Sequence, residues 1–410
     1  MKTPKSRREK TSEAALIGKL CKAAPHASGR NGVKLGIGDD AALFMPRRGH
    51  ETILTCDWFL EGTHFLQEVH PADAVGWKSL ARAVSDIAAM GGEPRCFLLS
   101  LALPETHAGR WLSEFLAGLR RAARKFDCPL AGGDTTRQSK ILINITVVGE
   151  VRPGHAVLRS GAQAGDILYV SGRLGEAELG LSWIVARSDQ GAGGRGGRHR
   201  VGKTEFDAFW SPAACRHLSG PAIPGTPRAA ARSRQSELLL SHREPRLART
   251  DPALQKHLYP ESRIALGRWL AGRHLATSMM DLSDGLSTDL TRLCAASRVG
   301  ARIEAAKIPT VRLPERTDDK RARFAGSAGR LGVEDRSAAA LNLALNGGDD
   351  YELLFTLRRG NARRLPHSFR GVPLTPIGVI TRQPGVILAW PDGRAELLRS
   401  RGWDPFRKRN

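Results

Sequence analysis

Residues 71–104 read PADAVGWKSLARAVSDIAAMGGEPRCFLLSLALP. Residues 71–90 place apolar side chains at the spacing of an amphipathic helix, and residues 95–104 form an apolar run that is typical of a buried strand. The alternation extends from about residue 32 to residue 151, with strands expected in ILTCDWF, CPLAGGD and ILINITVVGEV and a helix in WLSEFLAGLRRAARKF. This pattern predicts an α/β domain over residues 31–152.

A second set of elements follows a Pro-Gly interruption at residues 153–154. Strands are expected in GDILYVSG, YELLFTL and TPIGVIT, and a helix in ESRIALGRWLAGRHLA. We therefore predict a second α/β domain over residues 153–395. Residues 1–30 are expected to form a basic tail and a first helix, and residues 396–410 a C-terminal tail.

Residues 188–250 lose periodicity and are rich in Gly, Arg, Ala, Ser and Pro. Such a composition buries too little apolar surface to offset the entropy of ordering, so it predicts a disordered insertion inside the second domain. The chain has a formal net charge of +22, and the basic side chains gather in this insertion and in both tails. We interpret them as solvated segments, so a nucleic-acid partner is not expected.

Cysteine usage and hydropathy indicate the compartment. The six cysteines are widely spaced and form no CxxC motif, which predicts reduced thiols rather than a disulfide framework or a zinc site. The basic N-terminus lacks the apolar core of a leader peptide, and no stretch approaches the length of a membrane span. We expect a cytoplasmic protein with no membrane partner.

Aspartates recur at the edges of predicted elements, next to glycines or apolar residues, in GIGDDAALF, ILTCDWF, VSDIAAMGG, LAGGDTT, MMDLSDGLSTDL and LNGGDDYELL. Each acid taken alone fits a helix cap or a turn. Together they predict Mg²⁺, which proteins hold by a few carboxylates plus the phosphates of a substrate. Phosphates also require a cation, for which Arg159 in LRSGAQAGD is the candidate.

Residues 197–204, GRHRVGKT, match the P-loop pattern GxxxxGK[ST]. The pattern requires a preceding apolar strand and a following helix, whereas a Gly/Arg-rich tract surrounds this one. We interpret the match as chance and expect Lys203→Ala to leave activity intact.

The acidic motifs, together with CDWFLEGTHF, LAGGDTTR, RSGAQAGD and NGGDDYELLFT, resemble in order and separation those of the thiamine-monophosphate kinase family. The resemblance implies the two-domain fold of aminoimidazole ribonucleotide synthetase, an α/β (α+β) architecture with an N-terminal mixed sheet and helices and a C-terminal α/β domain. It also implies a homodimer that uses several Mg²⁺ ions and transfers the γ-phosphate of ATP to thiamine monophosphate, giving thiamine diphosphate and ADP.

The same resemblance implies three groups of site residues. The metal ligands would be Asp40, Thr55, Cys56, Asp57, Asp86, Asp134, Asp281 and Asp284. ATP would contact Gly133, Asp134, Arg159 and Ser283, and thiamine monophosphate would contact His64, Asp349 and Trp403. Asp86, Asp281 and Arg159 would be central to catalysis, and Asp350 would be structural.

Three positions depart from the family's pattern. Cys56 stands where a hydroxyl is usual, and a thiol is a poor Mg²⁺ ligand. Asp349 replaces a glutamate and is shorter by one methylene, and residues 257–263 read HLYPESR instead of HLRPxPR.

Two other readings stay open at this stage. One is another ATP-dependent enzyme of the same superfamily, of the aminoimidazole ribonucleotide synthetase or selenophosphate synthetase type. The other is a basic nucleic-acid-binding relative with impaired catalysis, which would bind DNA or RNA in a salt-dependent way.

Overall fold

The computed structural model describes residues 17–20, 28–37, 39–191, 251–313 and 333–405. The P-loop-like segment, the basic N-terminal tail and nearly all of the predicted insertion lie outside these residues. The exception is residues 188–191, which continue helix α4 (Glu176–Gly191) beyond the point where the sequence loses its periodicity.

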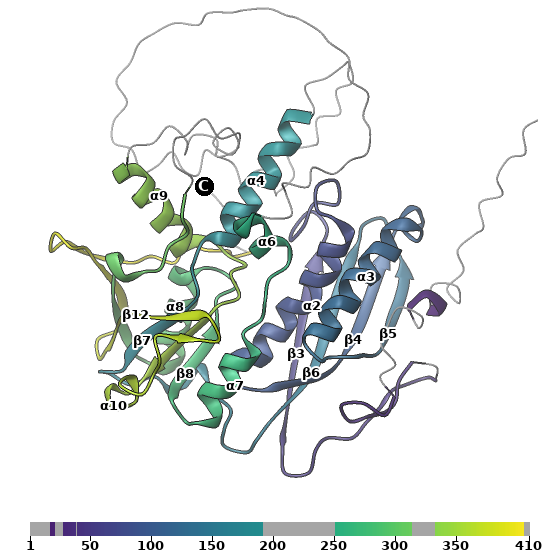
Figure 1. Cartoon of the computed structure of the whole chain (residues 1–410), viewed down its shortest axis with the longest axis horizontal. Helices are drawn as coiled ribbons and strands as arrows, with labels where there is room; N and C mark the ends of the chain where they lie inside the picture. Colours follow the sequence, from purple (N-terminus) through teal and green to yellow (C-terminus); the bar gives the residue numbers. More distant parts are fainter. Residues whose placement is uncertain (1–16, 21–27, 38, 192–250, 314–332, 406–410) are drawn as a thin grey trace, which may run out of the picture.

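The N-terminal half is a mixed four-stranded sheet covered on one face by two helices (Figure 1). Its strand order is β3-β6-β4-β5, in which β4 pairs antiparallel with β6 and parallel with β5. The strands are β3 (Glu51–Leu60), β4 (Glu93–Leu103), β5 (Leu130–Arg137) and β6 (Leu142–Val151), and the helices are α2 (Ala72–Ala89) and α3 (Arg110–Lys125). A short pair, β1 (Val33–Leu35) with β2 (Leu43–Phe44), precedes them.

Alternation along β3 decides which side chains face the helices. Ile53 and Phe59 point into the core beneath α2 and α3, as the period of two requires. Leu54 and Trp58 point to the opposite face, where 70% and 53% of their surface is exposed. The sheet therefore has one buried face and one apolar, open face.

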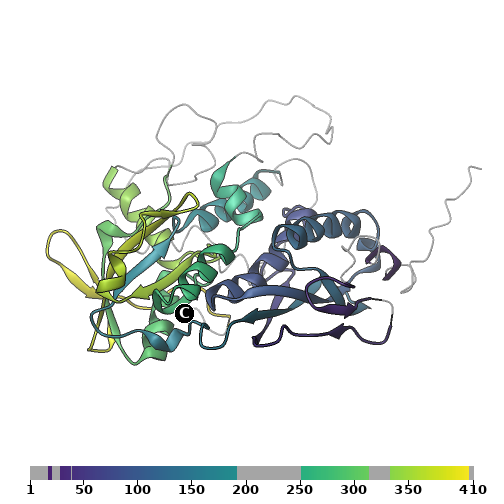
Figure 2. The same cartoon turned by 60° about the horizontal axis from the view of Figure 1, so that its bottom comes forward.

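The C-terminal half is an eight-stranded sheet with order β14-β13-β9-β12-β7-β10-β8 and with β11 paired to β12 (Figure 2). Its strands are β7 (Ile167–Ser171), β8 (Ala276–Asp281), β9 (Gly300–Glu304), β10 (Leu353–Leu357), β11 (Ser368–Phe369), β12 (Val372–Thr381), β13 (Gly385–Ala389) and β14 (Ala395–Leu397). The helices with it are α4, α6 (Pro252–Leu258), α7 (Ile264–Gly272), α8 (Leu286–Ser297), α9 (Val333–Asn346) and α10 (Arg359–Ala362). Three single-turn 3₁₀ helices, η1 (Glu105–His107), η2 (Arg159–Gly161) and η5 (Ala305–Lys307), are also present, and residues 17–20 are helical.

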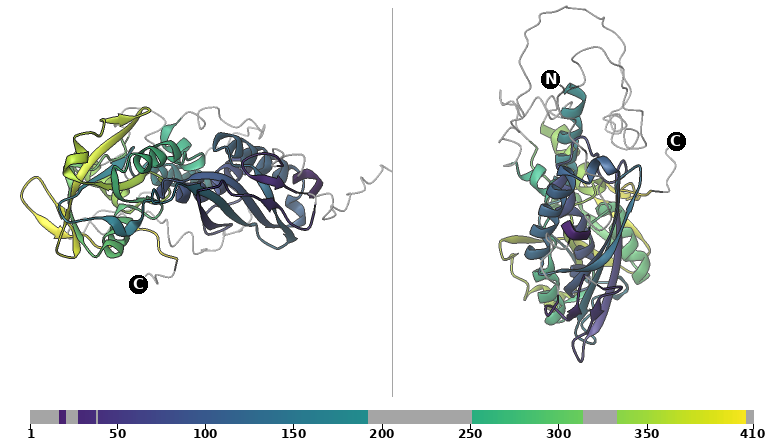
Figure 3. Two further views of the ribbon diagram at one scale, coloured as in Figure 1. Left: turned by 90° about the horizontal axis from the view of Figure 1, so that it is seen from below. Right: turned by 90° about the vertical axis from the view of Figure 1, so that its right-hand side faces the viewer.

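Helix α2 joins the two halves, which lie side by side in an elongated arrangement (Figure 3). The indole of Trp77 donates a hydrogen bond to the Pro260 carbonyl at 2.8 Å, and the hydroxyl of Ser262 donates to the Ala81 carbonyl at 2.6 Å. Ala89, at the end of α2, packs in one apolar cluster with Leu266 and Leu270 of α7. The face of α2 that looks toward the second half is therefore fixed.

One predicted strand begins later than its sequence suggests. YELLFTL reads as a strand from Tyr351, but β10 begins at Leu353. Asp349 and Tyr351 have φ angles of 66° and 49°, in the left-handed region, which an extended strand does not use. The chain turns sharply here before it enters the sheet.

Candidate active site

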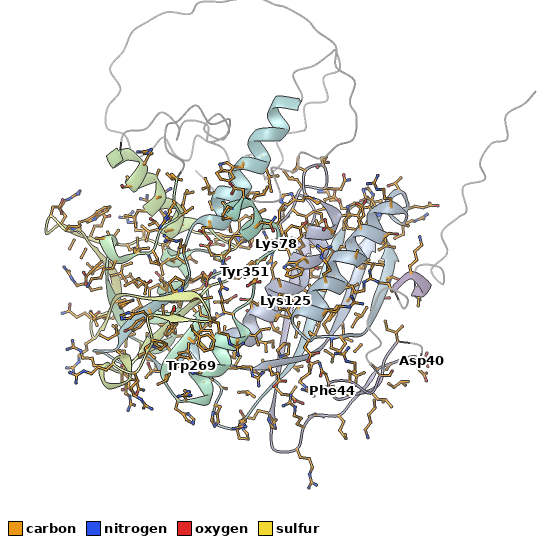
Figure 4. All side chains as sticks on the ribbon, in the orientation of Figure 1. Asp40, Phe44, Lys78, Lys125, Trp269 and Tyr351 are labelled. Carbon is orange, nitrogen blue, oxygen red and sulfur yellow. The ribbon has the colours of Figure 1, made fainter. Side chains whose placement is uncertain are left out.

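A pocket lies where the two halves meet, beside α2. It is lined by Asp57, Thr63, His64, Arg82, Asp86, Ala177, Glu178, Leu181, His257, Asp281, Ser283, Asp284, Gly348, Asp349, Tyr351 and Trp403. Figure 4 shows Lys78 of α2 and Tyr351 of the second half close to this junction. Eight of the predicted site residues thus line one pocket: Asp57, His64, Asp86, Asp281, Ser283, Asp284, Asp349 and Trp403.

Three acids from three elements form the first part of the pocket wall. Asp57 comes from β3, Asp86 from α2, and Asp281 from the end of β8. Burial and the charge of Asp57 raise the pKa of Asp86, and burial and the charge of Asp86 raise the pKa of Asp281. The hydroxyl of Thr55 donates a hydrogen bond to Asp86 Oδ2 at 2.5 Å. Because the carboxylates repel one another, this acid cluster favours a cation between them.

The loop that follows β8 is held by Asp289 of α8. Its Oδ2 accepts hydrogen bonds from the backbone N–H groups of Ser283 at 3.1 Å and Asp284 at 2.9 Å. Arg292 forms ion pairs with both Asp284 and Asp289. Burial and the charge of Asp284 raise the pKa of Asp289 to about 7. Asp289 therefore positions Ser283 and Asp284 and does not line the pocket itself.

The turn at residues 347–351 runs alongside that loop. The N–H of Asp349 donates to the Ser283 carbonyl at 2.8 Å, and the N–H of Tyr351 donates to the Leu282 carbonyl at 2.8 Å. Two non-glycine residues in the left-handed region make this a strained turn of the kind that gathers at functional sites. It brings Asp349 and Asp284 to one pocket.

Asp349 is paired on both carboxylate oxygens. Lys78 Nζ lies 2.7 Å from Oδ2, and the Tyr351 hydroxyl donates to Oδ1 at 2.6 Å. Burial alone would raise the pKa of Asp349, but the charges of Lys78 and Arg82 outweigh it and hold the pKa well below its usual range. Asp349 is therefore a permanent carboxylate in the pocket wall.

The next two acids of the same turn support the scaffold. Asp350 accepts hydrogen bonds from the N–H groups of Gly175 at 2.6 Å and Ala177 at 3.3 Å, which fixes the start of α4. Glu352 is buried and forms ion pairs with Lys256 and Arg263. These contacts indicate a structural role for Asp350 and Glu352.

The substituted segment HLYPESR also binds the two halves together. The Tyr259 hydroxyl donates to Asp73 Oδ2 of α2 at 3.1 Å, and its ring meets that of Trp77 edge to face, with centroids 6.2 Å apart. Tyr259 and Ser262, two of the three residues that depart from the family pattern here, thus contact α2.

Aromatic rings form the other end of the pocket wall. The ring centroid of His64 lies 5.8 Å from that of Phe59 and 6.1 Å from that of Trp403. Burial, with a smaller contribution from Arg82, lowers the pKa of His64 to about 3. His64 Nδ1 accepts a hydrogen bond from the Leu60 N–H at 3.0 Å, so the neutral ring carries its proton on Nε2.

The C-terminal segment is attached to the loop after β8. The N–H of Trp403 donates to the Asp284 carbonyl at 3.0 Å. The N–H of Gly402 donates to Thr288 Oγ1 at 3.0 Å, and a Cβ at Gly402 would lie 1.8 Å from the Asp284 carbonyl oxygen. Only glycine allows the chain to approach this closely, and the approach brings Trp403 to the pocket.

A buried polar chain lies behind Asp349. Lys78, whose side chain is 2% exposed, lies 3.3 Å from His257 Nδ1, and His257 Nε2 lies 3.1 Å from His70 Nε2. Burial and the charge of Lys78 lower the pKa of His70 to about 3 and that of His257 well below its usual range. Both histidines are therefore neutral in the folded protein at neutral pH.

Six predicted site residues lie outside the pocket lining, and one of them, Thr55, reaches the site only through its hydrogen bond to Asp86. Cys56 points to the open face of the sheet because it alternates with Thr55 and Asp57, and its thiol contacts the Asn144 side chain at 3.1 Å. Asp40 is exposed and lies at the far edge of the N-terminal half (Figure 4). The remaining three are Gly133, Asp134 and Arg159.

Gly133 and Asp134 belong to the edge strand β5. A Cβ at Gly133 would lie 1.9 Å from the Leu99 carbonyl oxygen, so the close contact with β4 requires glycine, and the Asp134 side chain is exposed. Arg159 is exposed in η2, although its charge reaches Asp86 and offsets part of the rise in the pKa of that acid. The single chain thus leaves these positions at the margin of the site.

Sequence reasoning missed Lys78, Arg82 and Tyr351. Lys78, Arg82 and Asp86 are spaced by four residues and therefore share one face of α2. Two cations in register with a predicted site acid, on an otherwise apolar helix, were the signal that could have found them.

The acid cluster is not a complete metal cage. Within residues 17–20, 28–37, 39–191, 251–313 and 333–405, no group of three or more His, Cys, Asp or Glu side chains has the arrangement to hold a metal ion alone. Mg²⁺ does not need such a cage, because it retains waters and substrate phosphates as ligands.

In the same described residues, none of the helices has the length and apolar character that crossing a membrane requires.

Comparisons with known proteins assign the chain to a family. The family model for the AIR synthase related protein N-terminal domain matches residues 38–151, and that for the C-terminal domain matches residues 228–390. The fold and the interdomain pocket thus define a two-domain α/β protein of the AIR synthase-related class. Thiamine-monophosphate kinase of Escherichia coli K12 is 32% identical over 92% of this chain and 94% of its own length. The chain belongs to the thiamine-monophosphate kinase family, as its motifs predicted.

Solved structures agree with this assignment. Thiamine-monophosphate kinase from Stenotrophomonas maltophilia K279a matches with a TM-score of 0.63 and 31% identity, covering 94% of this chain and 98% of that one. AaThiL complexed with AMPPCP and TMP matches with a TM-score of 0.60 and 26% identity, covering 98% and 100%. The Escherichia coli hydrogenase maturation protein HypE, with 17% identity and a TM-score of 0.61, shares the fold alone.

Proposed function

We propose that this chain transfers the γ-phosphoryl group of ATP to thiamine monophosphate, giving thiamine diphosphate and ADP. The observation that carries the proposal is one pocket in which an acid cluster, Asp57, Asp86 and Asp281, is continuous with an aromatic wall that includes His64 and Trp403. Phosphates with divalent ions suit the first part, and a heteroaromatic ring suits the second. The relatives named above support both substrates.

The chemistry needs no strong base on the protein. A phosphate monoester loses its second proton near pH 6, so the attacking oxygen is already ionised at neutral pH. The protein's part is to hold the two phosphates in line and to stabilise the charge of the transition state. Asp86, Asp281 and Arg159 remain our proposed catalytic residues, Arg159 through its charge at the margin of the site.

We propose Mg²⁺ as the ion between the acids, with several ions in the complete site. The buried carboxylates that raise one another's pKa fit such an ion. Asp57, Asp86, Asp281 and Asp284 would hold it, with Thr55 orienting Asp86. When bound, Mg²⁺ supplies charge neutralisation to the phosphates.

The thiamine ring would lie against His64 and Trp403, with Asp349 as a carboxylate acceptor at its side. His64 presents a neutral Nε2–H donor, because its Nδ1 is already bonded to Leu60. Ser283 lies in the loop beside the acids, where its placement suits a contact to ATP.

We further propose a homodimer. The open face of the N-terminal sheet exposes Leu54, Trp58 and Leu98 at 70%, 53% and 37%. A sheet face that exposes large apolar side chains suits a second copy of the chain. Asp40, Cys56, Gly133 and Asp134 stay our proposed metal and ATP contacts of the complete enzyme.

The cytoplasm is our proposed compartment, and no nucleic acid is proposed as a partner. Among the described residues, Cys56, Cys96, Cys128 and Cys294 are free thiols, which fits a reducing compartment. The acids expected for catalysis are in place in the pocket, which argues against a relative that has only a binding role.

ADP release tests the proposal against its superfamily rivals. Purified protein with ATP and Mg²⁺ is given thiamine monophosphate, formylglycinamidine ribonucleotide or selenide in parallel. We expect ADP only with thiamine monophosphate. ATP consumption with either of the others, and none with thiamine monophosphate, would place the chain with a rival enzyme.

A further inference from the structure

Arg82 is the only lysine or arginine among the described residues that line the pocket. The nearby cations already have partners: Lys78 is paired with Asp349 at 2.7 Å, and Arg292 is paired with Asp284 and Asp289. A pocket for two phosphorylated molecules needs positive charge that is still available.

Among the described residues, the guanidinium of Arg82 has no hydrogen-bond or ion-pair partner. Its Nε is buried without a hydrogen-bond acceptor, and the group makes no hydrogen bond or ion pair within the part of the chain that the structure describes. Leaving a buried donor unsatisfied is costly, so such a group is retained where a ligand completes it.

The guanidinium lies over an aromatic ring. Its Cζ lies 5.2 Å from the ring centroid of Phe59, a residue buried in the core under α2. A cation–π contact stabilises the charge of a guanidinium without using its N–H groups, so these donors stay available to an oxyanion. Burial alone would lower the pKa of Arg82, but the charges of Tyr351, Asp57, Asp349 and Asp284 outweigh it and raise that pKa above its usual range.

Its place along α2 indicates which phosphate it meets. Arg82 lies one turn after Lys78, the partner of Asp349, and one turn before Asp86 of the acid cluster. Its charge also acts on His64 of the aromatic wall. Arg82 is therefore positioned between the proposed ring site and the proposed metal site, where the phosphate of the acceptor has to be.

We propose that Arg82 binds the phosphate group of the acceptor phosphomonoester. This inference rests on the proposed function and specifies which side chain recognises the acceptor's phosphate. Arg82 would orient the attacking oxygen by two parallel N–H bonds, so its removal should weaken recognition of the phosphate and leave recognition of the ring unchanged.

Paired ligands test this. Binding of thiamine monophosphate and of thiamine is measured by calorimetry with Mg²⁺ for the wild type, Arg82→Gln and Arg82→Lys. We expect Arg82→Gln to bind thiamine monophosphate about 10- to 100-fold more weakly and thiamine within about twofold of the wild type. Arg82→Lys should recover part of the loss, because it restores charge without the bidentate geometry.

The matched control is Arg124→Gln, the same substitution at an exposed arginine of α3, which should bind both ligands as the wild type does. Equal loss for both ligands, or unchanged binding of thiamine monophosphate by Arg82→Gln, would overturn the inference. So would a loss confined to the affinity for a non-hydrolysable ATP analogue, which would assign Arg82 to the donor.

Failure of the proposed function would give a different result from failure of the role of Arg82. A wild-type protein that releases no ADP with thiamine monophosphate overturns the proposed function and the role of Arg82 with it. A wild type that does release ADP, combined with an Arg82→Gln variant that still distinguishes thiamine monophosphate from thiamine as the wild type does, overturns the role of Arg82 alone.

Discussion

The side chains of the pocket carry charges that the fold itself does not neutralise. Burial raises the pKa values of Asp86 and Asp281, with a further contribution from Asp57 to the first and from Asp86 to the second, while Lys78 holds Asp349 ionised. Asp349 is therefore less ready to accept a proton than Asp86 or Asp281. Lys78 Nζ lies 2.7 Å from its carboxylate, whereas Asp86 and Asp281 face further acids. A site of this kind is stabilised by its ligands rather than by the protein alone.

Asp281→Asn tests the cost of that arrangement. We expect turnover to fall by about three orders of magnitude or more, because a proposed metal ligand is lost. Thermal unfolding of the metal-free variant should occur at the same or a higher temperature than that of the wild type, since a buried repelling charge is removed. A variant with wild-type turnover would contradict the role of Asp281, and a strongly lowered unfolding temperature would contradict the account of repulsion.

His70 gives a prediction about pH. Its pKa is lowered to about 3 by burial and by Lys78, and it faces His257, with Lys78 and Asp349 beyond. Below pH 6.5 the unfolded chain gains a proton that the folded chain excludes, so this histidine reduces the free energy of unfolding as the pH falls toward 3.

The variant His70→Gln should remove that contribution. Between pH 7.5 and 5.5, the wild type should lose about 1 kcal/mol more of its free energy of unfolding than the variant does, as measured by urea unfolding. Exposed His367, changed to Gln, is the control and should leave the difference between the two pH values as in the wild type. An identical pH dependence in His70→Gln and the wild type would contradict a neutral, buried His70.

Among the elements, α2 contributes most to the site. It packs on its own sheet, contacts α7 of the second half, and presents Lys78, Arg82 and Asp86 along one face. The segment at residues 400–405 contributes from the other side through the backbone bonds of Gly402 and Trp403 to α8 and the loop before it. The pocket exists because these two elements meet there.

Trp403→Ala tests the contribution of the C-terminal segment. We expect the KM for thiamine monophosphate to rise by about 10-fold, because the ring that faces His64 is lost, and the KM for ATP to change by less than about twofold. Steady-state kinetics with each substrate varied in turn would measure both values. An unchanged KM for thiamine monophosphate would remove Trp403 from the proposed substrate site.

For the whole molecule, the open sheet face is the feature that the single chain leaves unexplained. Leu54→Glu should shift the protein from dimer to monomer in sedimentation at micromolar concentration, since it places a charge in the proposed interface. Leu397→Glu, at a leucine that is 61% exposed on β14, is the matched control and should leave the mass unchanged. A wild type that sediments as a monomer would contradict the proposed homodimer.

The sequence predicted the class of fold and most of the acids of the site. Alternation of apolar runs is a local signal, so the expected helix at residues 71–90 is close to α2 as observed, Ala72–Ala89. The aspartates were recognisable because a carboxylate next to glycine or apolar residues is costly to desolvate and therefore indicates a bound cation.

Other features depend on contacts between distant segments. The role of Arg82 became visible only when α2 was placed against Phe59 and the second half, and the turn at Tyr351 is set by bonds to Leu282 and Ser283. The direction of the Cys56 thiol, by contrast, followed from strand alternation and was open to prediction.

Product identification by ³¹P NMR tests the central claim most directly. The wild-type protein is incubated with ATP, Mg²⁺ and thiamine monophosphate, and the spectrum is followed over time. The account predicts that the phosphomonoester signal is replaced by the two coupled signals of thiamine diphosphate, with one ADP formed for each. A spectrum in which thiamine monophosphate persists, or in which ATP is hydrolysed to free phosphate without a new diphosphate, would contradict it.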